Sequence, residues 1–173
     1  MNNTLVWVQL AFLCVPFIVV MIGVAAAVRV VPEHTRLVMF RLGRTIGARG
    51  PGLVLLLPLI DRGVSVDLRE RVETIHAAQF LLHDRATLQM DVTYSYQTVD
   101  PVAVVLQVAD AHNALRQLVR TTLQTLMAEE YAGNLLSAHT RLEQEAAQRV
   151  RAHVETWGVV VHSIQLGNIE KRA

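Results

Sequence analysis

The N-terminal part of the chain carries no charged side chain before Arg29. Between Leu5 and Val28 almost every residue is apolar, and a helix of this length covers roughly 36 Å because each residue adds about 1.5 Å. The hydrocarbon core of a bilayer is about 30 Å thick. The segment therefore predicts an N-terminal transmembrane helix within residues 1–31. The residues expected to form and position this anchor are Leu5, Trp7, Pro16, Val28 and Arg29.

Two other interpretations of this segment stay open. Small residues at positions 25–27 are typical of a signal-peptide cleavage site, but no Lys or Arg precedes the apolar stretch, which is longer than an ordinary signal-peptide core. A hairpin that enters and leaves one leaflet would turn at Pro16, but a turn inside hydrocarbon leaves backbone groups without hydrogen bonds. The sequence favours a single kinked span over both.

The charges that flank the segment predict its orientation. No Lys or Arg precedes it, whereas Arg29, Arg36, Arg41, Arg44 and Arg49 follow it closely. Positive residues near a span tend to stay in the cytoplasm. We therefore expect a single-pass protein of the cell membrane with its C-terminal domain in the cytoplasm. A hairpin-inserted form, or a domain on the periplasmic or extracellular side, is the alternative.

The rest of the chain has the composition of a soluble domain. Over the whole chain 52% of the residues are apolar and 18% are charged, and the anchor takes a large share of the apolar ones. The net charge of +1 and the lack of basic runs mixed with aromatic residues give no reason to expect a nucleic-acid partner. We therefore expect two parts, an anchor over residues 1–31 and one folded domain over residues 32–173.

Apolar periodicity predicts several strands in this domain. Short apolar runs at 38–42 and 53–57 enclose the glycine-rich segment 43–52, which predicts a hairpin-like loop without the residues of a phosphate-binding motif. Residues 63–69 alternate between apolar and polar side chains. The alternation is clearest over Thr87–Thr98, which predicts a strand with one buried face in an antiparallel sheet.

Helical spacing follows. Asp100 and Pro101 predict the start of a short helix to about Val108, and Asp110 predicts the cap of a longer helix that Gly133 closes. A third helix is expected from about Ala138 to Trp157. The last strand, Val159–Ile169, changes its apolar phase, which predicts a bulge near His162 and Ser163. The fold class expected is α+β, an antiparallel-rich sheet with helices packed on one face.

Short motifs along the chain follow the order and approximate spacing of a known family. They are Met39–Arg44, Gly50–Leu53, Leu57–Asp61 and Val66–Arg69, and then Tyr94–Tyr96, Asp100–Pro101, Thr121–Leu123 and Trp157–Val159. The chain resembles the stomatin/prohibitin/flotillin/HflK-HflC superfamily, also called SPFH or Band 7, and within it the stomatin branch. The resemblance covers about residues 30–170 and implies an SPFH domain after the anchor.

The chain departs from the family pattern in three places. Ala77-Ala78-Gln79 stands where stomatins usually have Pro-Pro-Gln, Leu82-His83-Asp84 stands for Thr-Lys-Asp, and Arg120 stands for Gln. The sequence ends at Ala173, whereas family members typically continue into a long helical segment that drives assembly. The resemblance implies a homo-oligomer, and the missing segment weakens that expectation.

No group of residues predicts catalysis. The seven histidines form neither His-x-His nor His-Glu-x-x-His. Ser137 and His139 lack a nucleophile elbow, and Asp84 and Asp91 are more typical of a turn and a sheet surface than of an acid/base pair. We therefore expect no catalytic residue, no cofactor and no metal, and a protein that is not an enzyme.

Two surfaces are candidates for binding. The uncharged run from Leu53 to Ile60 is either a second membrane contact or a strand buried on both faces. Its expected membrane-facing residues are Leu53, Leu55, Leu56 and Ile60. The third helix is a candidate for self-association, or it only covers the sheet. The self-association residues expected on it are Leu142, Ala146, Val150 and Trp157.

These expectations give three functions from different classes. The favoured one is a membrane-anchored, non-enzymatic scaffold that organises membrane microdomains or regulates membrane proteins. Through the resemblance, its partners are the lipid bilayer and membrane proteins such as channels or a membrane-bound protease. The alternatives are a lipid-binding module without protein clients and, least favoured, a quality-control hydrolase.

Overall fold

The computed structural model describes residues 17–18, 21 and 27–172 and divides the chain into two compact units. The N-terminal unit is Met1–Val66 and the C-terminal unit is Asp67–Ala173. The anchor residues Leu5, Trp7 and Pro16 lie outside the described residues. Within the part of the chain that the structure does describe, no helix is both long and apolar enough to cross a bilayer.

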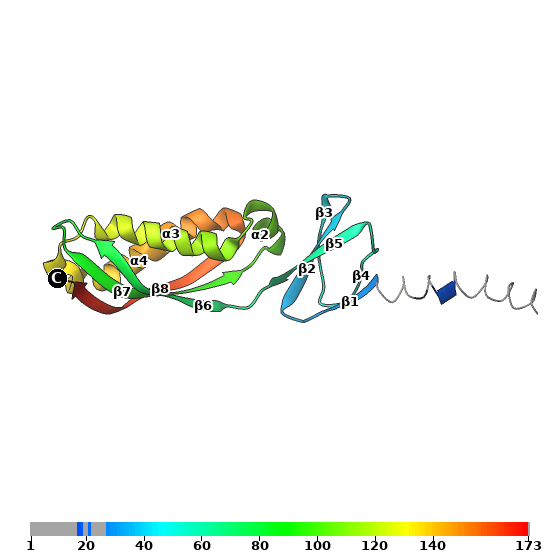
Figure 1. Cartoon of the computed structure of the whole chain (residues 1–173), viewed down its shortest axis with the longest axis horizontal. Helices are drawn as coiled ribbons and strands as arrows, with labels where there is room; N and C mark the ends of the chain where they lie inside the picture. The colour runs from blue at the N-terminus through cyan, green and yellow to red at the C-terminus, as the bar shows by residue number, and fades with distance from the viewer. Residues whose placement is uncertain (1–16, 19–20, 22–26, 173) are drawn as a thin grey trace, which may run out of the picture. The chain divides into compact units, whose positions relative to one another are not determined.

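The N-terminal unit is built from two small sheets (Figure 1). In the first, β1 (Val28–Val31) pairs antiparallel with β4 (Gly52–Leu55). The second has the order β3 (Arg44–Arg49), β2 (Thr35–Arg41), β5 (Asp61–Asp67). The side chains of Val31, Leu37, Met39 and Val54 form the small core between them.

Two expectations for this unit are corrected. Val28 and Arg29 do not end a membrane helix, because both lie in β1, opposite Leu55 and Val54. The glycine-rich segment 43–52 is not one long loop, because β3 forms within it and pairs with β2. The turn between β2 and β3 needs only Leu42 and Gly43, both of which have positive φ.

An ion pair fixes the segment that joins β4 to β5. The Asp61 carboxylate accepts hydrogen bonds from Arg41 Nε at 2.7 Å and Arg41 Nη2 at 2.9 Å, and from the Leu57 amide at 3.1 Å. The hydrogen bonds from Arg41 and then from Leu57 lower the pKa of Asp61 to about 2. Residues 57–61 therefore form a tight turn in which Leu59 has a φ of +83°.

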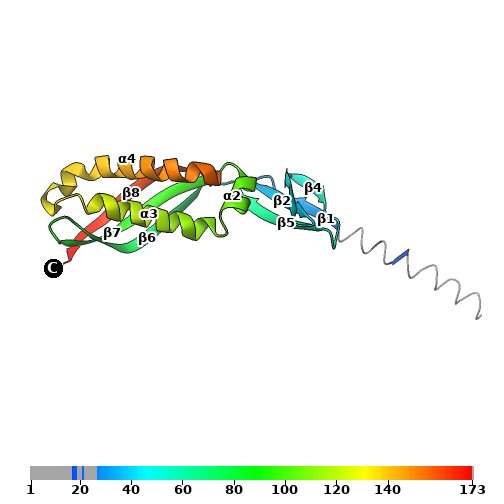
Figure 2. The same cartoon turned by 90° about the horizontal axis from the view of Figure 1, so that it is seen from above.

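The C-terminal unit is an antiparallel sheet covered by helices on one face (Figure 2). Its strands are β6 (Arg71–Leu81), β7 (Thr87–Thr98) and β8 (Val159–Arg172), with β7 in the centre. The helices are α2 (Pro101–Gln107), α3 (Ala111–Met127) and α4 (Leu135–Val154), with short 3₁₀ turns at Ala132–Asn134 and Glu155–Trp157. The expected α+β class is confirmed.

Most predicted elements of this unit are found close to their expected bounds. Strand β7 spans the predicted residues, and Asp100 and Asp110 cap α2 and α3 through their side chains. The predicted bulge in β8 is confirmed, because Ser95 pairs with Ser163 but Tyr96 pairs with Val161, which leaves His162 as the extra residue. The long helix ends at Met127 and not at Gly133.

One side chain of the central strand β7 stabilises two further bulges, one in β6 and one in β8. The Asp91 carboxylate accepts a hydrogen bond from the Ala77 amide of β6 at 2.8 Å and from Asn168 Nδ2 of β8 at 2.7 Å. Ala77 and Asn168 both have positive φ, and the strand registers shift beside them. These hydrogen bonds, first that from Ala77, lower the pKa of Asp91.

We predict that Gly158→Ala destabilises the C-terminal unit by about 2–4 kcal/mol. Gly158 has a φ of +73°, and a Cβ there would lie 2.6 Å from the Asp100 carbonyl oxygen, which cannot move away without disrupting the start of α2. Gly133→Ala is the matched control, because a Cβ at Gly133 meets nothing within 4 Å. Denaturant unfolding followed by circular dichroism measures both. Equal stability of the two variants would contradict the prediction.

We also predict that the Arg41–Asp61 contact weakens in acid. Because folding lowers the pKa of Asp61 from 3.8 to about 2, its contribution is present above about pH 4 and is lost as the pH falls towards 2. Hydrogen exchange of the Leu57 amide, corrected for the intrinsic exchange rate, measures this contact. Protection of Leu57 is expected to decrease below pH 4 in the natural chain and to be low at all pH values in Asp61→Asn. The Leu56 amide, which donates to the Ala27 carbonyl at 2.7 Å, is the control that should not follow this titration.

Candidate membrane-binding surface

The outer face of the β1–β4 sheet is an exposed apolar surface. The register places Val28 opposite Leu55 and Val30 opposite Leu53. The side chains between them on the other face, Val31 and Val54, are buried in the core. Because side chains alternate along a strand, this burial turns the four apolar partners outward. Leu53 is 77% exposed and Val30 is 74% exposed.

The turn after β4 adds a second apolar surface. Leu57, Leu59 and Ile60 are exposed. Leu42, which is also exposed, lies beside this turn because its amide donates a hydrogen bond to the Ile60 carbonyl at 3.2 Å. We call Val28, Val30, Leu53 and Leu55 the ribbon patch, and Leu42, Leu57, Leu59 and Ile60 the turn patch. Apolar groups gathered on a surface in this way typically mark a contact with a membrane or a protein.

The structure decides one alternative for the run Leu53–Ile60. The strand in this run is not buried on both faces, because Leu53 and Leu55 are exposed while Val54 is buried. Ile60 is also exposed, as a membrane-facing residue must be. Leu56 differs, because it is half-buried and packs against the core of the N-terminal unit. It is therefore removed from the expected membrane-facing set.

Val28 and Val30 belong to this surface, but the sequence pattern places Val28 at the end of the expected anchor and gives Val30 no role. Their alternation with Arg29 and the buried Val31 is a strand signal, but it spans only four residues and directly follows the long apolar segment. They are identified as surface residues by their pairing with β4. The sequence of one segment does not show with which other segment it pairs.

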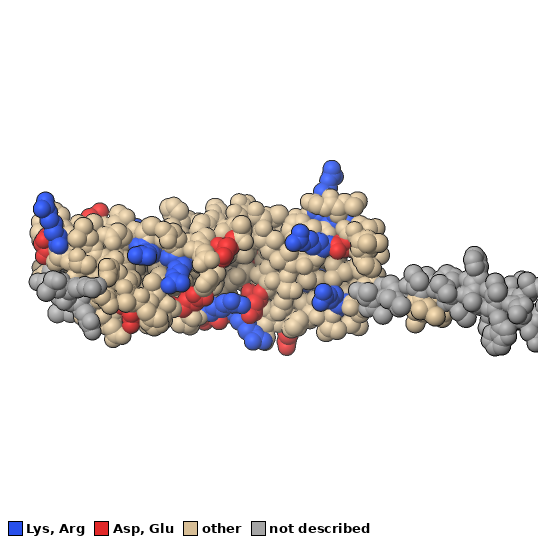
Figure 3. Space-filling model, in the orientation of Figure 1, with Lys and Arg blue, Asp and Glu red and all other residues tan. Residues whose placement is uncertain are grey.

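The two units differ in charge. The N-terminal unit has six arginines and only two acidic residues, Glu33 and Asp61. The C-terminal unit has ten basic residues against thirteen acidic ones. In Figure 3 the right-hand end of the coloured surface shows separate blue arginine groups, one of them beside a red carboxylate, among broad tan areas. Apolar patches on a basic unit suit a membrane surface that carries negative lipids.

The expected self-association residues lie elsewhere. Leu142, Ala146 and Val150 are almost fully buried in the core of the C-terminal unit, and Trp157 packs against that core. The apolar stripe of α4 therefore holds the helix on its own sheet, and these side chains are not open to a second copy. The expected self-association stripe is corrected accordingly, and the outer face of α4 is the part that a partner can reach.

The residues considered for chemistry have structural partners. Ser137 Oγ donates to the Asn134 carbonyl at 2.7 Å, and a ring nitrogen of His139 lies 3.0 Å from the Leu166 carbonyl oxygen. Asp84 accepts from the Ala86 amide at 3.1 Å, and Asp91 holds the two bulges. Over residues 17–18, 21 and 27–172, no three His, Cys, Asp or Glu residues are grouped as metal ligands.

Comparisons with known proteins agree with this architecture. A family model described as "SPFH domain / Band 7 family" matches residues 29–172, which begin in β1 and end in β8. The chain is 31% identical to a stomatin homolog of Pyrococcus horikoshii over 87% of this chain and 57% of that protein. It is 32% identical to Stomatin-3 of Caenorhabditis elegans, over 92% of this chain and 59% of that protein.

A mouse relative gives the same result. The chain is 32% identical to Stomatin-like protein 3 of Mus musculus over 86% of this chain and 52% of that protein. The chain thus spans little more than half the length of these curated relatives. Because the family model covers both compact units and nearly all of the described residues, the chain belongs to the SPFH domain / Band 7 family and is stomatin-like.

Proposed function

We propose that this protein is a membrane-associated, non-enzymatic scaffold whose N-terminal unit inserts its apolar patches shallowly into a bilayer. The observation that carries the proposal is the ribbon patch, four exposed apolar side chains on the outer face of β1 and β4. Relatives named as stomatins support a membrane location, and the basic character of the N-terminal unit supports contact with negatively charged lipids.

The energy of this contact is modest. Full burial of a Val or Leu side chain contributes about 1.5–3 kcal/mol, and the ribbon side chains are only partly exposed, so each adds roughly 1 kcal/mol. Four of them give a contact comparable to that of a single lipid anchor, which binds a membrane only marginally. We infer that the ribbon patch acts with the expected N-terminal anchor, and that it orients the domain against the bilayer more than it holds it there.

In a scaffold of this kind, the C-terminal unit is the part that binds partner proteins. The outer face of α4 carries polar and charged residues, such as Gln148 and the Arg149–Glu145 ion pair, and it is exposed. A domain held at the membrane raises the effective concentration of any protein that contacts this face, without a change in its affinity. We propose a second copy of the chain or another membrane protein as the partner.

One prediction tests whether the ribbon patch inserts into a bilayer. The chain has a single cysteine, Cys14, so Cys14→Ser with Leu55→Cys gives one labelling site in the full chain. In vesicles with brominated acyl chains, we expect a polarity-sensitive fluorophore at residue 55 to be blue-shifted and quenched. The same label at Val160 of β8 is the matched control, because Val160 is exposed but lies in the C-terminal unit. Equal quenching at both sites, or none at residue 55, would rule out insertion of the ribbon patch.

The second prediction separates a scaffold from a lipid-binding module without protein clients. A photoreactive amino acid replaces the exposed Gln148 on α4, and the full chain is irradiated in its native membrane. We expect a covalent adduct with a second copy or with one recurring membrane protein identified by mass spectrometry, and we expect Arg149→Glu to reduce its yield. A photoreactive group at His76, exposed on β6, is the control for random collisions. A strictly monomeric protein without a specific adduct would support the lipid-binding module instead.

A further inference from the structure

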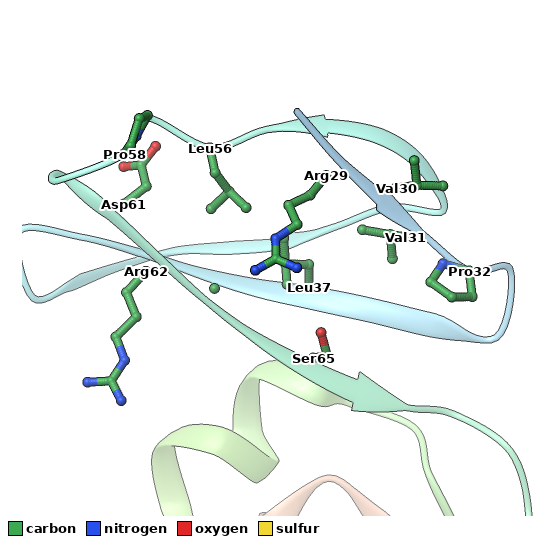
Figure 4. Close-up of a pocket in the computed structure, with 11 residues that line it drawn as sticks. Arg29, Val30, Val31, Pro32, Leu37, Leu56, Pro58, Asp61, Arg62 and Ser65 are labelled. Carbon is green, nitrogen blue, oxygen red and sulfur yellow. The ribbon is translucent and has the colours of Figure 1, made fainter. Parts of the chain in front are cut away.

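A cavity of about 400 Å³ lies in the N-terminal unit beside the ribbon patch. Its lining comes from β1, β2, the turn after β4 and β5, and it includes Arg29, Leu37, Leu56, Arg62 and Ser65. Figure 4 shows the Arg29 side chain extending over Leu37 towards Ser65, with Leu56 on the neighbouring wall. The cavity therefore combines an apolar wall with a guanidinium group.

Asp61 is the only carboxylate among the described residues that line this cavity, and its negative charge does not neutralise the positive charges of Arg29 and Arg62. Asp61 is already bound by Arg41 through two hydrogen bonds and by the Leu57 amide, and its side chain is fully covered. The side chains of Arg29 and Arg62 form no hydrogen bond or ion pair with any residue that the structure describes. Among the described residues, these two positive charges at the cavity therefore have no counterion.

The position of Arg29 indicates the kind of ligand. Arg29 lies between Val28 and Val30 in β1, and both of these belong to the ribbon patch. When that patch enters the acyl region of a bilayer, the long Arg29 side chain on the opposite face of the same strand reaches the depth of the headgroups. The guanidinium fork matches the geometry of a phosphate group, to which it donates two parallel hydrogen bonds.

We propose that this cavity binds the phosphate of one anionic phospholipid. Arg29 is the main ligand, the Ser65 hydroxyl is a second donor, and Leu37 and Leu56 contact the first carbons of the lipid. Arg62 extends from the rim, away from Leu37 in Figure 4, and adds positive potential. This inference rests on the proposed membrane function and adds to it a preference for lipid charge.

Lipid binding to the full chain is measured by native mass spectrometry after release from neutral detergent micelles. Phosphatidylglycerol and phosphatidylcholine of equal chain length are supplied together. We expect the natural chain to retain phosphatidylglycerol preferentially, and Arg29→Gln to lower the ratio of the two bound lipids about tenfold. The matched control is Arg44→Gln, which removes the same charge from β3, outside the cavity, and is expected to keep most of the preference. Circular dichroism verifies that both variants are folded.

Each other outcome overturns the proposal. An equal loss in Arg29→Gln and Arg44→Gln shows that net charge alone attracts the lipid. No preference in the natural chain shows that the cavity does not select a phosphate with a net negative charge. Displacement of the lipid by equimolar inorganic phosphate, or by a short acidic peptide, shows that the ligand is not a lipid. Because this measurement uses micelles, it does not depend on bilayer insertion, so its result and that of the residue 55 label are independent.

Discussion

One face of the two-stranded β1–β4 ribbon is left uncovered by the part of the chain that the structure describes. In the N-terminal unit the pairing of β1 with β4 buries Val31 and Val54 and leaves Val28, Val30, Leu53 and Leu55 outside. A single-residue shift of β1 in this register would exchange its two faces, turning Val28 and Val30 towards the core and Arg29 and Val31 outward. The register therefore creates the apolar surface, the position of Arg29 and the cavity together, and the proposed contact with a bilayer depends on it.

Hydrogen bonds in the rest of the N-terminal unit hold the turn that carries the second apolar patch. Leucines at positive φ are unfavourable, and Leu42 and Leu59 both adopt such a conformation while their side chains are exposed. The Arg41–Asp61 ion pair and the Leu57 amide hold the turn in which Leu59 lies. The same ion pair compensates the charge of Asp61, the carboxylate that lines the cavity. One contact thus stabilises the apolar turn and, within the described part of the chain, leaves Arg29 and Arg62 without a carboxylate partner.

Elements with an undisturbed pattern could be predicted from the sequence. Strand β7 alternates without interruption, and Asp100 and Asp110 are ordinary helix caps, so these elements were found near their expected bounds. Strand β6 was missed because its bulge at residues 76–77 shifts the buried positions from Ile75 to Ala78 and breaks the alternation. Strand β3 was missed because its glycines resemble a loop.

The candidate surfaces, too, could be predicted from the sequence only in part. Leu53 and Leu55 were predicted because an uncharged run is unusual in a soluble domain, but their partners in β1 were hidden by the apolar segment before them. The α4 stripe was misassigned because one helix shows only which of its faces is apolar, and not which neighbour covers that face. Its neighbour is the sheet of the C-terminal unit. Burial against its own sheet is enough to explain the apolar stripe of α4, so the stripe does not by itself indicate a binding partner.

The Asp91 carboxylate has a consequence for the shape of the C-terminal sheet. A bulge increases the local twist of a strand, and Asp91 fixes one bulge in β6 and one in β8 on either side of the same residue of β7. The added twist of the two outer strands is therefore concentrated on one line across the sheet. Along this line the sheet is expected to coil most strongly, so a single carboxylate helps to set the curvature of the surface on which α3 and α4 rest.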